Sequence, residues 1–390
     1  MKHISNMKKS FIELFDQEAT AAYFSPGRVN LIGEHTDYNG GHVFPCAITL
    51  GTYALVAKRE ANASRLFSLN MPEAGVIEFP MQGAIYDEAR DWANYPIGVV
   101  RTMEEAGYRA DGGLDILFYG TLPSGAGLSS SASIEVLTAL ILNDQFGFGR
   151  EMIELVQLSQ RAENTFVGVN CGIMDQFAVG MGKKDCAILL DCNTLEYRYS
   201  PIALKDSSIV ITNTNKKHSL NASKYNERRR ECEHALSCIQ QTKNVRSLGE
   251  LKAAEFDSIA DTIPDVTERC RARHAVHENE RTLKAVAALE KNDLVAFGQL
   301  MNASHISLMD DYDVTGEELD TLAELAWRQP GVIGSRMTGA GFGGCTVSIV
   351  KDNAIEAFQR DIAAGYTKKI GYAPSFYVAG IADGTHRIEL

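Results

Sequence analysis

The sequence predicts a mixed α/β (α+β) protein with two domains, and three observations carry this prediction. At 390 residues, the chain has room for two, or at most three, compact domains. Near its centre, an apolar strand, a glycine- and serine-rich loop and a buried helix follow one another. Around residues 201–210 the pattern changes, and the chain beyond is more helical and more charged. We therefore expect one domain at residues 1–205 and a second at 206–390.

The first domain is expected to contain strands and helices in turn. Residues 11–15 have the pattern of a short amphipathic helix. The apolar segments 29–32 and 43–44 flank a glycine-bounded loop, which predicts a hairpin-like unit. Residues 114–120 alternate like a strand, and 134–146 have the apolar spacing of a buried helix. Further strands are expected at 52–59, 64–68 and 187–191, and further helices at 87–107, 151–167 and from 170–177.

The second domain is expected to be rich in helices and to end in a βαβ pattern. Its first helix, around residues 224–233, interleaves arginines with glutamates, so it does not form a nucleic-acid patch. The order of strand, helix and strand near the end is typical of half of a ferredoxin-like fold. Strands are expected at 209–213, 345–350 and 375–378, and helices at 272–291, 293–310, 316–328 and 354–366.

Composition excludes several classes of partner. The net charge is −12, so nucleic acids and anionic membranes are not expected partners. A bound nucleotide would need local neutralisation by a metal, a few cations and backbone N–H groups. The eight cysteines form no Cys-x-x-Cys pair and no zinc spacing, which is typical of reduced thiols in a cytoplasmic protein. We expect neither a signal peptide nor a transmembrane span, because no apolar run is long enough.

The central loop at 123–133, Pro-Ser-Gly-Ala-Gly-Leu-Ser-Ser-Ser-Ala-Ser, is suited to anion binding. Its glycines let the backbone approach a ligand, and the following helix offers unpaired N–H groups. The serine hydroxyls add donors, and one could bind a metal. The loop is not a Walker motif, because no Gly-Lys-Ser/Thr follows, and Ser130 stands where a dinucleotide motif has its third glycine. The alternative is that the serines only cap the helix.

A compact polar cluster lies in the glycine-bounded loop of the first domain. Glu34, His35 and Asp37 occur within four residues of one another. Such a cluster either binds a polar ligand or forms a solvated turn, and the residues alone leave both interpretations open.

Two further carboxylates stand in apolar surroundings. Glu163 lies seven residues after Val156, near the apolar face of its helix, where a carboxylate is costly unless it is compensated. Arg161 is not expected to compensate it, because i,i+2 side chains diverge on a helix. Either a bound metal or a position at the edge of the apolar face would explain Glu163. Asp175, in an apolar segment, could be a helix-capping acid or a catalytic carboxylate.

A second glycine-rich segment, Gly-Ala-Gly-Phe-Gly-Gly at 339–344, precedes the strand at 345–350. Four glycines in six residues indicate backbone that lies against a ligand or another strand. The alternative is a flexible loop.

Three stretches taken together resemble the GHMP family of small-molecule kinases. They are the run Gly-Arg-Val-Asn-Leu-Ile-Gly-Glu-His-Thr-Asp-Tyr at 27–38, the loop at 123–133 and the glycine segment at 339–344. The first is similar to the signature of the family's galactose-phosphorylating branch, and the other two are shared across the family. The resemblance covers nearly the whole chain, with no departure at a functional position.

This resemblance implies a fold and an activity. The fold would be a ribosomal-S5-like first domain and a ferredoxin-like second domain, with the active site between them. The activity would be ATP-dependent phosphorylation of α-D-galactose at its C1 hydroxyl, the first step of galactose catabolism by the Leloir pathway. The substrates would be galactose and ATP, with Mg²⁺ as cofactor, in a cytoplasmic and monomeric enzyme.

The resemblance also implies a role for each candidate residue. Asp175 would act on the C1 hydroxyl as a base or as an orienting carboxylate, with Arg28 beside it. Mg²⁺ would be bound by Ser131 and Glu163, and Ser68 would contact the nucleotide. The sugar would be held by Glu34, His35, Thr36, Asp37 and Tyr225. The ATP phosphates would be held by Gly125, Ala126, Gly127, Leu128, Ser129, Ser130 and Ser131.

Two other functions remain open from the sequence. One is a sibling kinase that acts on another small alcohol, such as N-acetylgalactosamine. The other is a sugar sensor on the same scaffold, which binds without catalysis. The full set of candidate residues argues against the sensor, and the hydroxyl-binding cluster at 34–37 favours an unsubstituted hexose.

Overall fold

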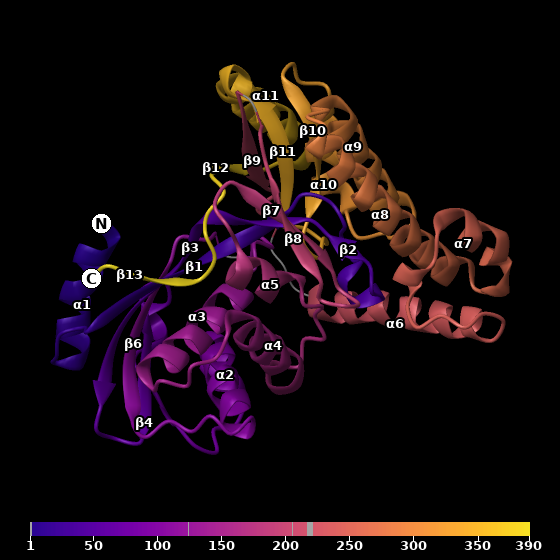
Figure 1. Cartoon of the computed structure of the whole chain (residues 1–390). Helices are drawn as coiled ribbons and strands as arrows, with labels where there is room; N and C mark the ends of the chain where they lie inside the picture. The colour runs from indigo at the N-terminus through magenta and orange to yellow at the C-terminus, as the bar shows by residue number, and fades with distance from the viewer. Residues whose placement is uncertain (1, 124, 205, 217–220) are drawn as a thin grey trace.

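The computed structural model describes residues 2–123, 125–204, 206–216 and 221–390, and its two main sheets lie in different halves of the chain (Figure 1). The first sheet has the strand order β13-β1-β3-β6-β4-β5, in which only β4 and β6 pair in parallel. Its strands are β1 (Ala21–Asn30), β3 (Pro45–Arg59), β4 (Ala63–Ser68), β5 (Ile77–Pro80), β6 (Gly113–Gly120) and β13 (His386–Ile388).

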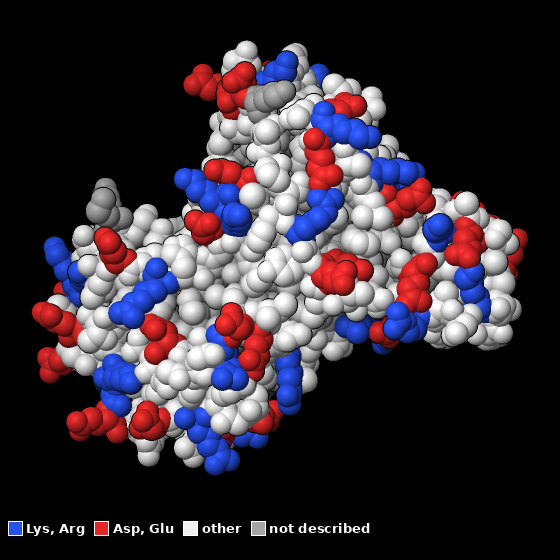
Figure 2. Space-filling view, viewed as in Figure 1, with Lys and Arg blue, Asp and Glu red and all other residues white. Residues whose placement is uncertain are grey.

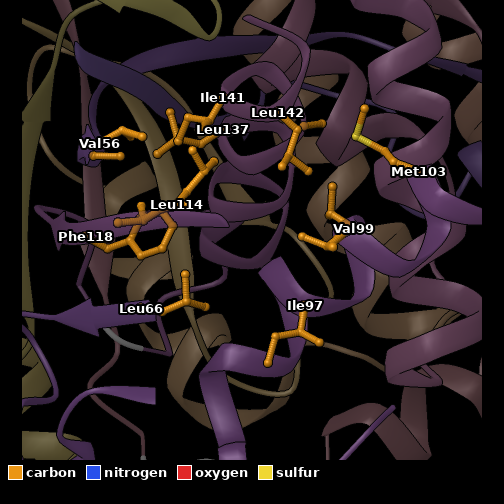
Figure 3. Packing of buried hydrophobic residues seen from close by; sticks show 14 of the residues in the cluster. Val56, Leu66, Ile97, Val99, Met103, Leu114, Phe118, Leu137, Ile141 and Leu142 are labelled. Carbon is orange, nitrogen blue, oxygen red and sulfur yellow. The ribbon is translucent and has the colours of Figure 1, made fainter. Parts of the chain in front are cut away.

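Both faces of this sheet are covered by helices. The strands alternate, so that Tyr23, Val56 and Phe118 join the core under α2 and α3, while Ala22 and Leu55 face α1. Figure 3 shows the first of these cores, with aliphatic side chains of the two helices packed on those of β3, β4 and β6. The helices are α1 (Lys2–Phe15), α2 (Asn94–Glu105), α3 (Ser130–Gln145), α4 (Met152–Ala162) and α5 (Met174–Met181).

The second sheet is antiparallel, with the order β10-β11-β9-β12. Taken along the chain, its strands and helices give the order and topology of a ferredoxin-like fold, which confirms the predicted fold class. The strands are β9 (Ser207–Asn213), β10 (Val332–Thr338), β11 (Cys345–Lys351) and β12 (Ser375–Ala379). The helices are α6 (Asn221–Gln240), α7 (Ala253–Ile259), α8 (Val266–Glu290), α9 (Leu294–Asp310), α10 (Gly316–Trp327) and α11 (Ile355–Ile370).

A continuous apolar core joins the two halves. It contains Val29 and Phe44 from the first half and Ile211, Phe297 and Val347 from the second. A third sheet, of β2 (His42–Val43), β7 (Cys186–Asp191) and β8 (Tyr197–Pro201), lies at this junction. After β12 the chain returns to the first sheet, where β13 pairs with β1, so the two termini lie near each other (Figure 1). Such a large apolar contact favours a fixed arrangement of the two sheets.

Most of the expected elements are present, with changed limits. The hairpin-like unit is confirmed, because β1 and β3 pair across the glycine-bounded loop. The helix expected at 151–167 changes to a π-helical segment, η4 (Glu163–Val167), at the end of α4. The first helix is longer than 11–15, and α5 starts only at Met174. The elements that were not predicted from the sequence are β5, β8, β10, β13 and α7.

The surface agrees with the expectations from composition. Lysine and arginine are interspersed with aspartate and glutamate over the face shown in Figure 2. The arginines of α6 pair with their neighbours, for example Arg228 with Glu231 and Arg229 with Glu233. All eight cysteines are free thiols. Among the described residues, no helix combines the length and apolar character needed to cross a bilayer.

Candidate active site

A cavity of about 230 Å³ lies where the two halves of the chain meet. Its walls combine the polar loop after β1 and the start of α5 with Tyr225 of α6 and the glycine segment after β10. The expected site residues that line it are Arg28, Glu34, His35, Asp37, Glu163, Asp175 and Tyr225. The structure therefore brings these seven residues together from separate stretches of the sequence.

Arg28 and Asp175 form a two-pronged ion pair in this cavity. Nε and Nη2 of Arg28 each lie 2.8 Å from one carboxylate oxygen of Asp175. Although burial disfavours the charged guanidinium, Asp175 and Glu34 outweigh that effect and raise the pKa of Arg28. Nη1 of Arg28 donates to the carbonyl of Gly127 at 2.7 Å. Asp175 lies in the first turn of α5, where it pairs with Arg28.

The loop that carries Glu34 and His35 is held rigidly. Glu34 is buried, and its carboxylate accepts hydrogen bonds from Asn30 Nδ2 at 2.7 Å and from the Gly339 N–H at 2.6 Å. Burial raises the pKa of Glu34, and the facing arginines oppose this shift. His35 has a φ of 60°, which is strained for a residue with a side chain, and its Nδ1 lies 2.8 Å from the hydroxyl of Tyr38. Burial lowers the pKa of His35 to about 3, so the imidazole is neutral at pH 7.

Asp37 lies against the start of α5. A β-carbon on Gly172 would be only 1.9 Å from Asp37 Oδ2, so this close approach requires glycine. Burial, followed by the negative charge of Asp175, raises the pKa of Asp37 to about 7, although the N–H groups of Tyr38 and Met174 oppose the shift. Asp37 can therefore either donate or accept a hydrogen bond near neutral pH.

The loop before α3 has the backbone shape of an anion-binding site. Gly125, Gly127 and Ser129 have φ values of 65°, 69° and 62°. The Ser129 hydroxyl is buried and has no hydrogen-bond partner in the described part of the chain. Because α3 begins at Ser130, its first N–H groups point toward this loop. Ser124, in the same loop, lies outside the described residues.

This loop is held in place by its own buried side chains and by a second glycine segment that packs against it. Ala126 and Leu128 are buried in the core at the junction of the two halves. A β-carbon on Gly339 would lie 2.8 Å from the Gly127 carbonyl, and one on Gly344 would lie 3.2 Å from the carbonyl of Ala126. The glycines of the segment 339–344 thus let its backbone pack on the loop before α3.

Glu163 lies beside other carboxylates. It is 6% exposed, and burial, followed by the charge of Asp175, raises its pKa. The hydroxyl of Ser131 donates a hydrogen bond to Glu163 and opposes that shift. Glu135 is fully buried nearby, and burial, followed by the charge of Glu163, raises its pKa well above the usual range. Arg161 pairs with Glu105, as expected from its direction on the helix, and makes no pair with Glu163.

Comparison with known proteins identifies the family. The galactokinase galactose-binding signature matches residues 9–58, and the GHMP kinase N-terminal and C-terminal domains match 94–183 and 285–368. The chain is 61% identical to a galactokinase of Clostridium beijerinckii and 60% identical to one of Clostridium acetobutylicum, over the full length of each protein. The chain belongs to the galactokinase family of GHMP kinases.

Solved structures agree with this assignment. The crystal structure of Lactococcus lactis galactokinase complexed with galactose covers 99% of the chain, with a TM-score of 0.96 and 48% identity. The whole of that structure is matched. A mevalonate kinase of Methanococcus jannaschii has a TM-score of 0.68 at 15% identity, which shows the shared GHMP kinase fold alone.

Of the residues that the galactokinase resemblance implied as ligands, those that do not line the cavity are Thr36, Ser68 and the loop residues 125–131. Thr36 is fully buried, and its hydroxyl donates to the carbonyls of Gly33 and His42 at 2.9 and 2.7 Å. Its side chain therefore braces the loop after β1. Ser68 is buried at the end of β4, where its hydroxyl accepts a hydrogen bond from the Asn70 N–H at 3.3 Å. Its contact with the nucleotide stays a prediction.

A buried arginine that faces the Glu34 carboxylate was not predicted from the sequence. Arg336 of β10 is 0% exposed and lies 3.5 Å from Glu34 Oε1. Its Nη1 also donates to the carbonyl of Asn30 at 2.9 Å. A single arginine within an apolar strand was the available signal, but the strand itself was not predicted.

Two residues of α8 were also missed. His274 Nε2 lies 3.1 Å from the backbone carbonyl of Glu34, and Glu278 Oε1 accepts a hydrogen bond from the Gly33 N–H at 3.0 Å. Their i,i+4 spacing places them on one face of the helix, but α8 carries many charged residues and the spacing alone does not distinguish these two.

Proposed function

We propose that this protein transfers the γ-phosphoryl group of ATP to the C1 hydroxyl of α-D-galactose, giving α-D-galactose 1-phosphate and ADP. One observation carries the proposal: the Arg28–Asp175 pair lies in a polar cavity and is hydrogen-bonded to the glycine-serine loop. The kinship with galactokinases, one of which was crystallised with galactose, supports the choice of sugar.

Asp175 and Arg28 would serve the reacting atoms. Phosphoryl transfer depends on positioning and charge stabilisation more than on covalent help. The Asp175 carboxylate, oriented by two hydrogen bonds, can accept the proton of the C1 hydroxyl or hold that hydroxyl in line with the phosphate. The guanidinium of Arg28 can offset the negative charge on the transferred group.

The loop residues Glu34, His35 and Asp37, together with Tyr225, would bind the sugar hydroxyls. Carboxylate oxygens accept hydrogen bonds from hydroxyls, and the neutral imidazole of His35 provides one nitrogen that donates and one that accepts. Galactose and glucose differ only at C4. A buried polar group that loses its hydroxyl partner discriminates strongly between such substrates.

The nucleotide would bind near the Arg28 end of the Arg28–Asp175 ion pair, where Arg28 donates to the Gly127 carbonyl. The backbone N–H groups of residues 125–131 and the unpartnered hydroxyl of Ser129 are suited to the phosphates. Ser68 would contact the nucleotide further along β4.

The chemistry of Ser131 and Glu163 fits Mg²⁺. Both offer hard oxygen ligands, and phosphate and water supply the remaining positions that this ion prefers. The negative charge of Asp175 beside Glu163 is a second sign that the site suits a cation. When bound with ATP, Mg²⁺ neutralises charge on the β- and γ-phosphates.

The proposal also covers the cell compartment, the oligomeric state and the domain boundaries. Eight free thiols suit the reducing cytoplasm. The reaction needs two small molecules and no macromolecular partner, so a monomer suffices. The proposed domains, 1–205 and 206–390, each contain one main sheet, although the last strand returns to the first sheet. Residue 205, at the boundary, lies outside the described residues.

Phosphorus NMR of the purified protein with MgATP and a sugar tests the function directly. With galactose we expect a sugar 1-phosphate signal and an equal amount of ADP. Glucose and N-acetylgalactosamine should react more slowly. If galactose and ATP bind but no sugar phosphate forms, the protein is a sugar sensor. A faster reaction with N-acetylgalactosamine would instead indicate the sibling kinase.

A further inference from the structure

A buried amide group lies between two carboxylates beside the proposed metal site. Nε2 of Gln176 is 2.6 Å from Glu163 Oε2 and 3.0 Å from Glu135 Oε2. Gln176 and Glu135 are both 0% exposed, and neither lines the cavity. Burying polar side chains away from ligands costs free energy unless they are well bonded. Their presence beside Glu163 therefore needs a reason.

Three elements that carry proposed catalytic groups converge on this amide. Glu135 lies one helical turn after Ser131 in α3, on the same face. Glu163 begins the π-helical segment that follows α4, and such segments are frequent at functional sites. Gln176 directly follows Asp175 in α5. One side chain thus joins the helices of both proposed metal ligands and of the carboxylate that serves the sugar.

The hydrogen-bonding chemistry fixes how the amide must lie. The NH₂ group of Gln176 donates to one oxygen of each carboxylate, so its Oε1 points elsewhere. Gln176 Oε1 has no hydrogen-bond partner within the described residues. Cys171 Sγ also donates to Glu163 Oε2, at 3.4 Å. Both donors reach Oε2 of Glu163, and the Ser131 hydroxyl also donates to this carboxylate, so Glu163 is held on the side of Ser131.

We propose that Gln176 is a positioning residue for Glu163, and that Glu135 in turn orients the amide of Gln176. Gln176 fixes Glu163 Oε2 so that the carboxylate stays on the side of Ser131, where the metal would bind. Glu135 receives the second N–H of the amide and prevents the group from rotating. This inference rests on the proposed kinase function, because it assigns the surroundings of the metal that the kinase would use.

Manganese binding tests this role without measuring activity. Electron paramagnetic resonance reports free Mn²⁺ during titration of the protein with a non-hydrolysable ATP analogue present. We expect Gln176→Met to weaken Mn²⁺ binding by roughly tenfold or more, the usual scale for losing a partner of a metal ligand. Glu135→Gln should weaken it less. The double variant should bind Mn²⁺ no more weakly than Gln176→Met alone, because both changes act through one amide.

Two controls separate positioning from general damage. Gln145→Met removes an amide hydrogen bond to Tyr23. Because Gln145 lies about 20 Å from Ser131 along α3, this variant should bind Mn²⁺ like the wild type. Galactose binding by calorimetry should be unchanged in all variants. Wild-type Mn²⁺ affinity in a folded Gln176→Met protein would overturn the inference. If Gln176→Met does not fold, Glu135→Gln takes its place, since it replaces only one carboxylate oxygen by an amide nitrogen. Wild-type Mn²⁺ affinity in Glu135→Gln would then overturn the inference.

The proposed function and this inference can fail separately. Galactose phosphorylation by the wild type, followed by phosphorus NMR, tests the function. If the wild type makes galactose 1-phosphate and both variants bind Mn²⁺ normally, only the positioning role is wrong.

Discussion

The proposed sugar side and the proposed metal side of this site treat two buried carboxylates, Glu34 and Glu163, in opposite ways. On the sugar side, formed by Glu34, His35, Asp37 and Tyr225, Glu34 faces Arg336 and accepts two further hydrogen bonds. On the metal side, formed by Ser131, Glu135, Glu163 and Gln176, the described residues give Glu163 and Glu135 neutral donors and like-charged neighbours, with no ion pair. On the proposed sugar side the protein itself supplies the cation that faces Glu34, whereas on the proposed metal side a bound cation would have to offset the negative charge.

The difference follows from where the partners come from. Arg336, His274 and Glu278 belong to the second half of the chain and hold the loop of the first half. The metal side is built from α3, η4 and α5, all in the first half. Changes on the sugar side should therefore affect the stability of the whole molecule, and changes on the metal side should affect metal binding with little loss of stability.

The largest effect is expected from Arg336→Met. This change takes away one of the two arginines that face the buried Glu34, and breaking a buried pair in this way costs about 3–5 kcal/mol in the free energy of unfolding. Urea unfolding measures the loss. As a control, Arg360→Met removes an exposed pair with Asp361 and should leave the stability almost unchanged. Equal stability of Arg336→Met and the wild type would show that the sugar side does not depend on this pair.

Asp175 lies where the two sides meet, and the change Asp175→Asn should lower catalysis without preventing galactose binding. We expect kcat to fall by about 10² or more, the scale for losing a general base, while galactose still binds. Steady-state kinetics and calorimetry measure the two effects. The exposed Asp257, changed to Asn, serves as a control without effect on kcat. Near wild-type turnover by Asp175→Asn would reduce Asp175 to a structural partner of Arg28.

Glu163→Gln and Ser131→Ala should raise the Mg²⁺ concentration needed for half-maximal rate, by roughly tenfold or more. Glu163→Gln should not lower the melting temperature, because it removes a charge from a group of like charges. An unchanged Mg²⁺ requirement in both variants would remove these residues from the metal site. A large loss of stability in Glu163→Gln would contradict the contrast between the two sides.

A further effect, which depends on pH, is expected at Asp37. Its pKa is about 7 in the folded protein, against about 3.9 in an unfolded chain, so folding favours the protonated form. The stabilisation is therefore fully present below about pH 4 and is lost as the pH rises to about 7. Asp37→Asn cannot titrate, so its melting temperature should rise relative to the wild type across this range. A constant difference between the two proteins would show that Asp37 is ionised throughout.

The elements predicted correctly from the sequence are those that local residue patterns determine. The strand, loop and helix around Ser130 and the helix that carries Glu163 follow from periodicity and glycine spacing, and both are present. The polar cluster at 34–37 and the glycine segment at 339–344 were recognised as special. Whether they bound a ligand or formed turns was left open by the residues and was decided by resemblance to a family.

The sequence could not predict contacts between distant segments. Arg336 lies in a strand whose glycine and serine obscure its apolar alternation, and its partner is some 300 positions away in the chain. The short polar strand β13 is defined only by its pairing with β1. Gln176 stands beside Asp175 in sequence, but its two carboxylate partners belong to other helices. These features depend on tertiary packing and leave no local signature.

The most direct test of this account is a calorimetric titration of the wild-type protein with galactose in EDTA, without nucleotide. The account predicts one bound galactose per chain, with an affinity that added Mg²⁺ does not change, because the protein itself supplies the cation that faces Glu34 on the proposed sugar side. Galactose binding that appears only after Mg²⁺ and ATP analogue are added would contradict it, since the metal side would then be needed to build the sugar side.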